Sequence, residues 1–286
     1  MYFQARGVPY HYRDAGPKEA PALLLLHGFT ASIETWEPFI PLWSQQHRVI
    51  SVDLPGHGKT PSPAEEGRFK MQEVVHDLCL LLDHLNIEKT SILGYSMGGR
   101  VAISFAVHAS ERVERLIVEN ASPGLKTEEE RRQRRERDEQ LAHRITTFGM
   151  ASFVAYWREL DLFASQKALP MSVRETLDQE RLQNSPSGLA SSLRGMGTGA
   201  QPSYWDALPT LSVQLTFIAG TLDQKFLDIG QDICERVPNN TMLVAENAGH
   251  AVHIESPVWF ATTVLNALND QKEEQTDELG NGKRVR

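Results

Sequence analysis

The stretch that decides the fold spans residues 90–109 and reads TSILGYSMGGRVAISFAVHA. Its first residues are an apolar, strand-like run, and a helical pattern of small residues follows the turn at residues 94–98 (GYSMG), which fits G-x-S-x-G. So tight a turn between a strand and a helix needs small residues at 94 and 98, so that the serine hydroxyl projects from a strained backbone. We therefore predict Ser96 as a nucleophile; the alternative is a serine that only caps a helix.

Around this stretch, short apolar runs alternate with longer helical patterns, which is typical of a mainly parallel sheet with helices on both faces. The predicted strands are 2–5, 10–13, 22–26, 48–52, 90–93, 113–118, 213–219 and 242–245, and the predicted core helices are 71–85, 100–109 and 257–268. The run at 22–26 (ALLLL) is entirely apolar, as expected of a strand that is buried on both faces. The expected fold class is therefore α/β.

The composition is that of a globular protein, with 41% hydrophobic and 23% charged residues in a chain of 286. The net charge of −8 argues against nucleic acid and anionic membranes as partners, because both bind basic surfaces. Cys79 and Cys234 are the two cysteines, and we expect them to be reduced, buried side chains. We find no charged-then-apolar leader and no run near the roughly 18 to 20 apolar residues of a membrane span, so we expect a soluble, cytoplasmic protein. The oligomeric state is left open.

The strand pattern stops between about residues 125 and 205. This segment is helical in pattern, begins with the charge block 128–138 (EEERRQRRERD) and ends in a Gly/Ser-rich stretch at 185–203. We expect residues 125–205 to form a helical cap, inserted into a core made of residues 1–124 and 206–270. The polar tail at 271–286 has nothing to bury, and we expect it to be disordered.

An acid and a base follow the serine along the chain. Asp223 comes directly after the predicted strand 213–219, at the strand end where open α/β sheets place their sites. His250 lies in a glycine-containing loop just before the last helix. Serine, then acid, then histidine is the chain order of the α/β hydrolases, so we predict that fold, with His250 as the base and Asp223 as the group that orients it. The weaker alternatives are Asp228, Asp232 and His253.

The tripeptide His27-Gly28-Phe29 follows the buried strand 22–26. In the α/β-hydrolase fold, the loop at this place supplies one backbone N–H of the oxyanion hole, and the residue after the nucleophile supplies the other. This resemblance implies that the donors are the main-chain N–H groups of Phe29 and Met97. We expect His27 itself to be structural.

Several segments also resemble one particular family, the 2-succinyl-6-hydroxy-2,4-cyclohexadiene-1-carboxylate synthases of menaquinone biosynthesis. These segments are GYSMGGR (94–100), DLPGHG (53–58), ENASPGL (119–125) with the basic run after it, and AGH (248–250). That family removes pyruvate from 2-succinyl-5-enolpyruvyl-6-hydroxy-3-cyclohexene-1-carboxylate by proton abstraction and elimination, with neither water as a reactant nor a cofactor. The resemblance implies that Ser96 and His250 act on a carbon acid, with Asp223 behind them, and form no acyl-enzyme.

A small anionic polycarboxylate substrate requires concentrated guanidinium groups in a protein this acidic. Arg100 lies one helical turn beyond Ser96, hence on the same face as the nucleophile. Arg131, Arg134 and Arg135 share one face of the charge block. The resemblance implies that Arg134 binds a substrate carboxylate and that four more residues contact substrate: Tyr95, Trp157, Arg181 and Phe226. The alternative for the arginines is a solvated, salt-bridged surface.

Three functions remain open from the sequence. The first is the elimination just described, and the second is hydrolysis of an ester, or of a carbon–carbon bond in a ring-cleavage product, by the same triad. The third is a binding protein that kept the fold and lost catalysis, which predicts a broken triad. We predict no metal site, because His250 and His253 lie three residues apart without an evident third ligand, and we find no phosphate-binding glycine loop.

Overall fold

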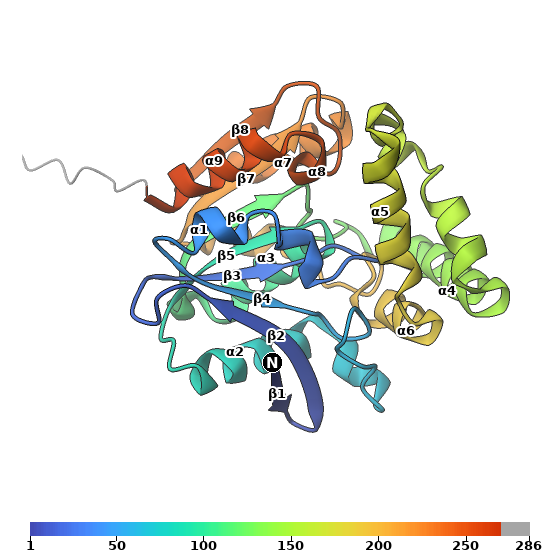
Figure 1. Cartoon of the computed structure of the whole chain (residues 1–286), viewed down its shortest axis with the longest axis horizontal. Helices are drawn as coiled ribbons and strands as arrows, with labels where there is room; N and C mark the ends of the chain where they lie inside the picture. The colour runs from blue at the N-terminus through green and yellow to red at the C-terminus, as the bar shows by residue number, and fades with distance from the viewer. Residues whose placement is uncertain (270–286) are drawn as a thin grey trace, which may run out of the picture.

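The structure, a computed structural model, describes residues 1–269, so the tail predicted at 271–286 lies outside the described part. Its centre is an eight-stranded sheet with the strand order β1-β2-β4-β3-β5-β6-β7-β8 (Figure 1). The strands are β1 (Tyr2–Ala5), β2 (Val8–Ala15), β3 (Ala22–Leu26), β4 (Arg48–Val52), β5 (Thr90–Tyr95), β6 (Val113–Glu119), β7 (Gln214–Gly220) and β8 (Asn240–Ala245). β1 and β2 are antiparallel, as are β2 and β4, and every later pair of neighbours is parallel. The sheet confirms the predicted, mainly parallel α/β class.

Helices cover both faces of this sheet. One face carries α2 (Met71–His84), α3 (Met97–His108) and α7 (Gln224–Cys234), and the other carries α1 (Ile40–Trp43), α8 (Val252–Glu255) and α9 (Pro257–Asn269). Four short 3-10 turns join these elements: η1 (Ile33–Trp36), η2 (Glu66–Phe69), η3 (Ser110–Arg112) and η5 (Trp205–Thr210). Within residues 1–269, no helix has the length and apolar character needed to cross a membrane.

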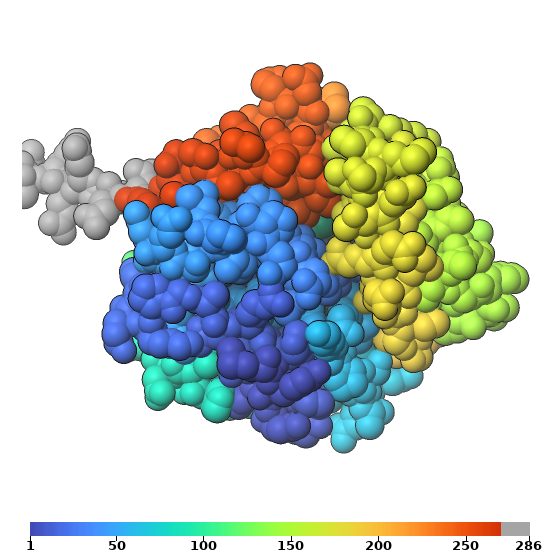
Figure 2. Space-filling model, viewed as in Figure 1, coloured from blue at the N-terminus to red at the C-terminus, as the bar shows by residue number. Residues whose placement is uncertain are grey.

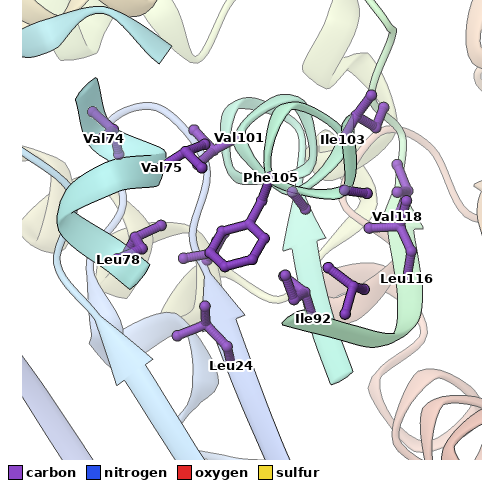
Figure 3. Packing of buried hydrophobic residues seen from close by; sticks show 14 of the residues in the cluster. Leu24, Val74, Val75, Leu78, Ile92, Val101, Ile103, Phe105, Leu116 and Val118 are labelled. Carbon is purple, nitrogen blue, oxygen red and sulfur yellow. The ribbon is translucent and has the colours of Figure 1, made fainter. Parts of the chain in front are cut away.

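Strand β3 shows how an apolar run builds both halves of the core. Successive side chains of a strand point to opposite faces. Leu24 and Leu26 therefore pack with α2 and α3, whereas Leu23 and Leu25 pack with α1 and α9, and all four are completely buried. In Figure 3, Phe105 of α3 points down toward Leu24 and Ile92 of the sheet. Burial of each such side chain stabilises the fold by roughly 1.5–3 kcal/mol.

Between β6 and β7 the chain leaves the sheet and forms a separate group of helices. These are α4 (Glu128–Trp157), η4 (Asp161–Ala168), α5 (Met171–Leu182) and α6 (Pro186–Met196). A capping box between Thr127 and Glu130 starts α4, and a left-handed residue, Gly149 (φ +74°), kinks it. Ile145, Phe153 and Leu189 belong to a small apolar core of this group. We call the segment 120–210 that carries these helices the cap; α4, α5 and α6 stand together beside the carboxyl ends of the strands (Figures 1 and 2).

Candidate active site

The turn between β5 and α3 has the strained backbone that the sequence predicted. Ser96 adopts φ +50° and ψ −105°, and its N–H donates to the carbonyl oxygen of Glu119 at the end of β6 over 2.9 Å. A Cβ on Gly98 would overlap the carbonyl oxygen of Leu26, and a Cβ on Gly94 would lie 2.6 Å from the nitrogen of Gly99. Only glycine at these two positions lets α3 start so close to β3 and β5. The turn thus presents the Ser96 hydroxyl at the carboxyl edge of the sheet.

The three predicted triad residues meet at this edge. His250 Nε2 lies 3.0 Å from Ser96 Oγ, and His250 Nδ1 lies 2.8 Å from Asp223 Oδ2. Both His250 and Asp223 are buried. With the Nδ1 proton held by the carboxylate, Nε2 is left to accept the proton of the serine hydroxyl. This arrangement makes Ser96 a nucleophile or, with His250, a base.

Asn120, which the sequence analysis did not single out, fixes the loop that carries His250. It follows β6 with φ +45°, and its Nδ2 donates to the carbonyl oxygen of His250 over 2.8 Å and to that of Gly249 over 3.3 Å. Asn120 also lines the cavity above Ser96. An asparagine two residues after the predicted strand 113–118 was the signal available in the sequence.

The alternative acids and base have other partners. Both carboxylate oxygens of Glu119 lie 2.9 Å from His253 Nδ1, in a fully buried pair. Asp228 accepts from Gln224 and Asp232 pairs with Lys126, both on the exposed side of α7. Within residues 1–269, the side chains of Asp228, Asp232 and His253 form no hydrogen bond with Ser96 or His250.

His27 joins the loop after β3 to the loop after β4. Its Nδ1 lies 2.8 Å from the carbonyl oxygen of Gly28, and its Nε2 accepts the N–H of Leu54 over 2.9 Å. Burial lowers the pKa of His27, so its ring stays neutral. Its position agrees with a structural role.

The two amides predicted as oxyanion donors face the same cavity as Ser96. Phe29 and Met97 both line it. Within residues 1–269, no protein acceptor takes the N–H of Phe29 or of Met97. Two free N–H groups beside a nucleophilic serine are the arrangement that binds a developing oxyanion.

The cavity has a volume of about 390 Å³ and lies between the carboxyl ends of the strands and the cap. Its aromatic lining consists of Phe29, Tyr95, Trp157, Phe163, Trp205 and Phe226. Its charged lining consists of Arg100, Lys126, Arg134, Lys225, Glu130 and Asp232. An aromatic cavity with four cations and two acids suits an anionic organic ligand.

The cations of the cavity repel one another. Arg100 is buried and donates only to neutral oxygens, the Met196 carbonyl at 2.6 Å and Gln201 Oε1 at 3.1 Å. Burial, and then the neighbouring Arg134 guanidinium, lower the pKa of Arg100 to about 9. Burial and Arg134 likewise lower the pKa of Lys225. Arg134 itself pairs with Asp138 over 2.7 Å. A bound anion would relieve this repulsion.

The remaining residues predicted to contact substrate lie in different places in the structure. Tyr95, Trp157 and Phe226 line the cavity together with Arg100 and Arg134. Arg131 and Arg135 instead pair with Glu128, outside it. Arg181 is buried beside a smaller cavity of about 40 Å³ and pairs with Asp178 over 3.1 Å. Lys126 and Lys225 were missed, although Lys126 directly follows the segment 119–125 and Lys225 lies between Asp223 and Phe226.

His57, in the turn after β4, packs against the rings of His27 and Phe29. Its Nδ1 lies 3.1 Å from the carbonyl oxygen of Pro55, and within residues 1–269 its buried Nε2 has no hydrogen-bond partner. Burial, and then His27, lower the pKa of His57 from 6.5 to about 3. The surroundings of His57 therefore favour its neutral imidazole.

Comparison with known proteins places these observations in context. A family model described as the alpha/beta hydrolase fold matches residues 21–257. The chain is 42% identical over 262 residues to the putative 2-succinyl-6-hydroxy-2,4-cyclohexadiene-1-carboxylate synthase of Bacillus subtilis (strain 168), covering 92% of this chain and 95% of that protein. It is 33% identical over 253 residues to the synthase of the same name from Salmonella heidelberg (strain SL476), covering 88% of this chain and 96% of that protein. The solved structure of MenH from S. aureus is similar, with a TM-score of 0.87, 33% identity, and coverage of 91% of this chain and 97% of that one.

The buried imidazole predicts a specific acid sensitivity. A group whose pKa is depressed in the folded state contributes stability above its unfolded pKa, and this stability is lost as the pH falls through the folded pKa. For His57 that window lies between 6.5 and about 3, and the loss is on the order of 5 kcal/mol. Urea unfolding at a series of pH values measures it.

His57→Gln should flatten this pH dependence although it lowers stability at pH 7. His76→Gln, at an exposed position of α2, is the control and should leave the dependence unchanged. Parallel pH profiles for wild type and His57→Gln would contradict the interpretation.

Proposed function

We propose that this chain, which belongs to the α/β-hydrolase fold family and within it to the 2-succinyl-6-hydroxy-2,4-cyclohexadiene-1-carboxylate synthases, eliminates pyruvate from 2-succinyl-5-enolpyruvyl-6-hydroxy-3-cyclohexene-1-carboxylate. The reaction belongs to menaquinone biosynthesis. The observation that carries the proposal is a Ser–His–Asp triad with hydrogen-bond distances of 3.0 and 2.8 Å at the floor of a cation-lined cavity.

The chemistry follows from the change between substrate and product. A ring 3-ene becomes a 2,4-diene when C2 loses a proton and C5 loses its enolpyruvyl oxygen. The C–H electron pair forms the C2–C3 double bond, the C3–C4 pair moves to C4–C5, and the C5–O bond breaks. Enolpyruvate leaves and takes up a proton to become pyruvate, so the atoms balance without water. Because C2 carries the succinyl carbonyl, its proton is acidic enough for a positioned base.

The triad residues would divide this work among themselves. Ser96 and His250 together act as the base on C2, and Asp223 stabilises the imidazolium that forms. Negative charge develops on the succinyl carbonyl oxygen as the proton leaves. The amides of Phe29 and Met97 would hold that oxygen, and one such donor contributes about 3 kcal/mol to transition-state stabilisation.

Charge complementarity supports this substrate. The substrate bears three carboxylates, one on the ring, one on the succinyl group and one on the enolpyruvyl group. Arg100 and Arg134 line the cavity, as do Lys126 and Lys225. Arg100 is the strongest of these assignments, because within residues 1–269 it donates to neutral oxygens and forms no ion pair with a carboxylate. Arg181, beside the smaller cavity, would act through its charge.

Ester hydrolysis is the second candidate, and a specific observation favours it. The serine, the imidazole and the two unpartnered amides stand as acyl transfer requires. The cavity cations restrict this activity to esters that bear carboxylates. In either case we propose a cytoplasmic enzyme acting on a small molecule, which the net charge of −8 and the unpaired Cys79 and Cys234 support.

Ser96→Ala should abolish pyruvate release and leave the fold intact, because the hydroxyl is the group that meets C2. The measurement is the initial rate of pyruvate formation, together with circular dichroism. Ser91→Ala, a hydroxyl deletion at a buried position of β5, the strand that leads to Ser96, is the control and should keep near-wild-type turnover. Full turnover by Ser96→Ala would remove the triad assignment.

Arg100→Ala and Arg134→Ala should each weaken kcat/KM for the polycarboxylate substrate by roughly 1.5 to 3 kcal/mol per charged hydrogen bond lost. Arg131→Ala is the matched control, since Arg131 lies on the same helix as Arg134 but pairs with Glu128. Its kinetics should stay within about 0.5 kcal/mol of wild type. Unchanged kinetics for both test variants would contradict substrate binding by Arg100 and Arg134 and would favour an ordinary hydrolase.

A further inference from the structure

A single cap residue, Asn184, bridges two core loops beside the active site. It follows α5, and its Nδ2 donates to the carbonyl oxygen of Thr30 over 2.7 Å. Its Oδ1 accepts the N–H of Gly58 over 3.4 Å. Asn184 is buried, with 6% of its surface exposed. The amide thus joins the loop after β3, which carries Phe29, to the loop after β4.

The loop after β3 needs such support because its backbone is strained. Thr30, next to Phe29, has φ +73°, in the left-handed region that a β-branched residue rarely adopts. A residue in this conformation persists only where its surroundings hold it. Within the loop, the N–H of Ala31 donates to the carbonyl oxygen of Gly28 over 3.2 Å. From outside the loop, the bond donated by Asn184 holds the carbonyl group of Thr30.

A second contact of α5 holds the same loop further along. Glu180, one helical turn before Asn184, accepts from both the N–H and the hydroxyl of Ser32 through Oε1, each over 3.0 Å. The start of α6 also packs closely against the loop after β4, since a Cβ on Gly56 would lie 2.6 Å from the carbonyl oxygen of Gly188. The cap therefore holds the loop that carries Phe29 by directional polar bonds at two successive points, Thr30 and Ser32.

We propose that Asn184 is a positioning residue that sets the Phe29 N–H for the oxyanion through Thr30, so that the cap completes the oxyanion hole of the core. This inference rests on the oxyanion role of Phe29 in the proposed function. If Asn184 were only structural, replacing it would lower the stability of the protein and leave the reactivity of Ser96 in folded molecules unchanged.

Diisopropyl fluorophosphate tests the proposal without the natural substrate. Ser96 Oγ attacks phosphorus, the P–F bond breaks, His250 takes the serine proton and fluoride leaves; the phosphoryl oxygen gains negative charge in the oxyanion hole. Losing a whole oxyanion donor costs about 10²- to 10³-fold in rate, so a misplaced donor in Asn184→Ala should slow phosphorylation by roughly 10- to 100-fold. In the pyruvate assay, kcat should fall by a similar factor and KM should change by less than about threefold.

Gln183→Ala, at an exposed position of the same turn, is the matched control and should react like wild type. Asn184→Asp is the second variant, in case Asn184→Ala does not fold. It keeps the shape and the acceptor for Gly58 but turns an oxygen toward the Thr30 carbonyl, so it should be slowed as much. Circular dichroism and Tm are recorded for each variant.

Phosphorylation of either folded Asn184 variant at the wild-type rate would overturn the inference. A different result would contradict the proposed function. A wild-type chain that reacts with the fluorophosphate but releases no pyruvate would refute the elimination and leave the role of Asn184 open to the same rate comparison.

Discussion

The closeness of α3 to the sheet is the constraint on which the rest of this structure depends. Because α3 starts directly against the end of β3, residues 94 and 98 have no room for a side chain, and Ser96 takes a conformation with φ +50°. That same turn aims the serine hydroxyl at His250 and frees the N–H of Met97. It also lies beside the end of β6, whose Glu119 carbonyl fixes it and whose Asn120 fixes the histidine loop. The residues that we propose as nucleophile, base and oxyanion donor are thus positioned by one packing contact.

We propose that the cap makes the catalytic site selective for anionic substrates. It contributes Arg134 to the cavity; burial, and then the Arg134 guanidinium, lower the pKa of Arg100 in α3. In the proposed function, a substrate carboxylate beside Arg100 and Arg134 would offset the repulsion between the two guanidinium groups. With Asn184, the cap also reaches the loop of Phe29. If both proposals hold, the same group of helices contributes to substrate selectivity through Arg134 and to transition-state stabilisation through Asn184.

Much of this could be predicted from the sequence, because the decisive signals are local. The turn around Ser96 and the loop positions of Asp223 and His250 are visible as short patterns, and the comparisons confirmed the fold and the family. The sequence carries no comparably clear signal for Asn120, Lys225 and Asn184, because their roles depend on how distant loops and the cap meet. Arg181 shows the same limit: its place behind the main cavity follows from how α5 packs, which no local pattern encodes.

The most direct test of the account is the rate of pyruvate release by the wild-type chain from 2-succinyl-5-enolpyruvyl-6-hydroxy-3-cyclohexene-1-carboxylate, measured beside cleavage of a short-chain aryl ester. The account predicts fast release of one pyruvate per substrate and little ester cleavage. Rapid ester cleavage without pyruvate would contradict it: the fold and triad would stand, and the assigned reaction would be wrong.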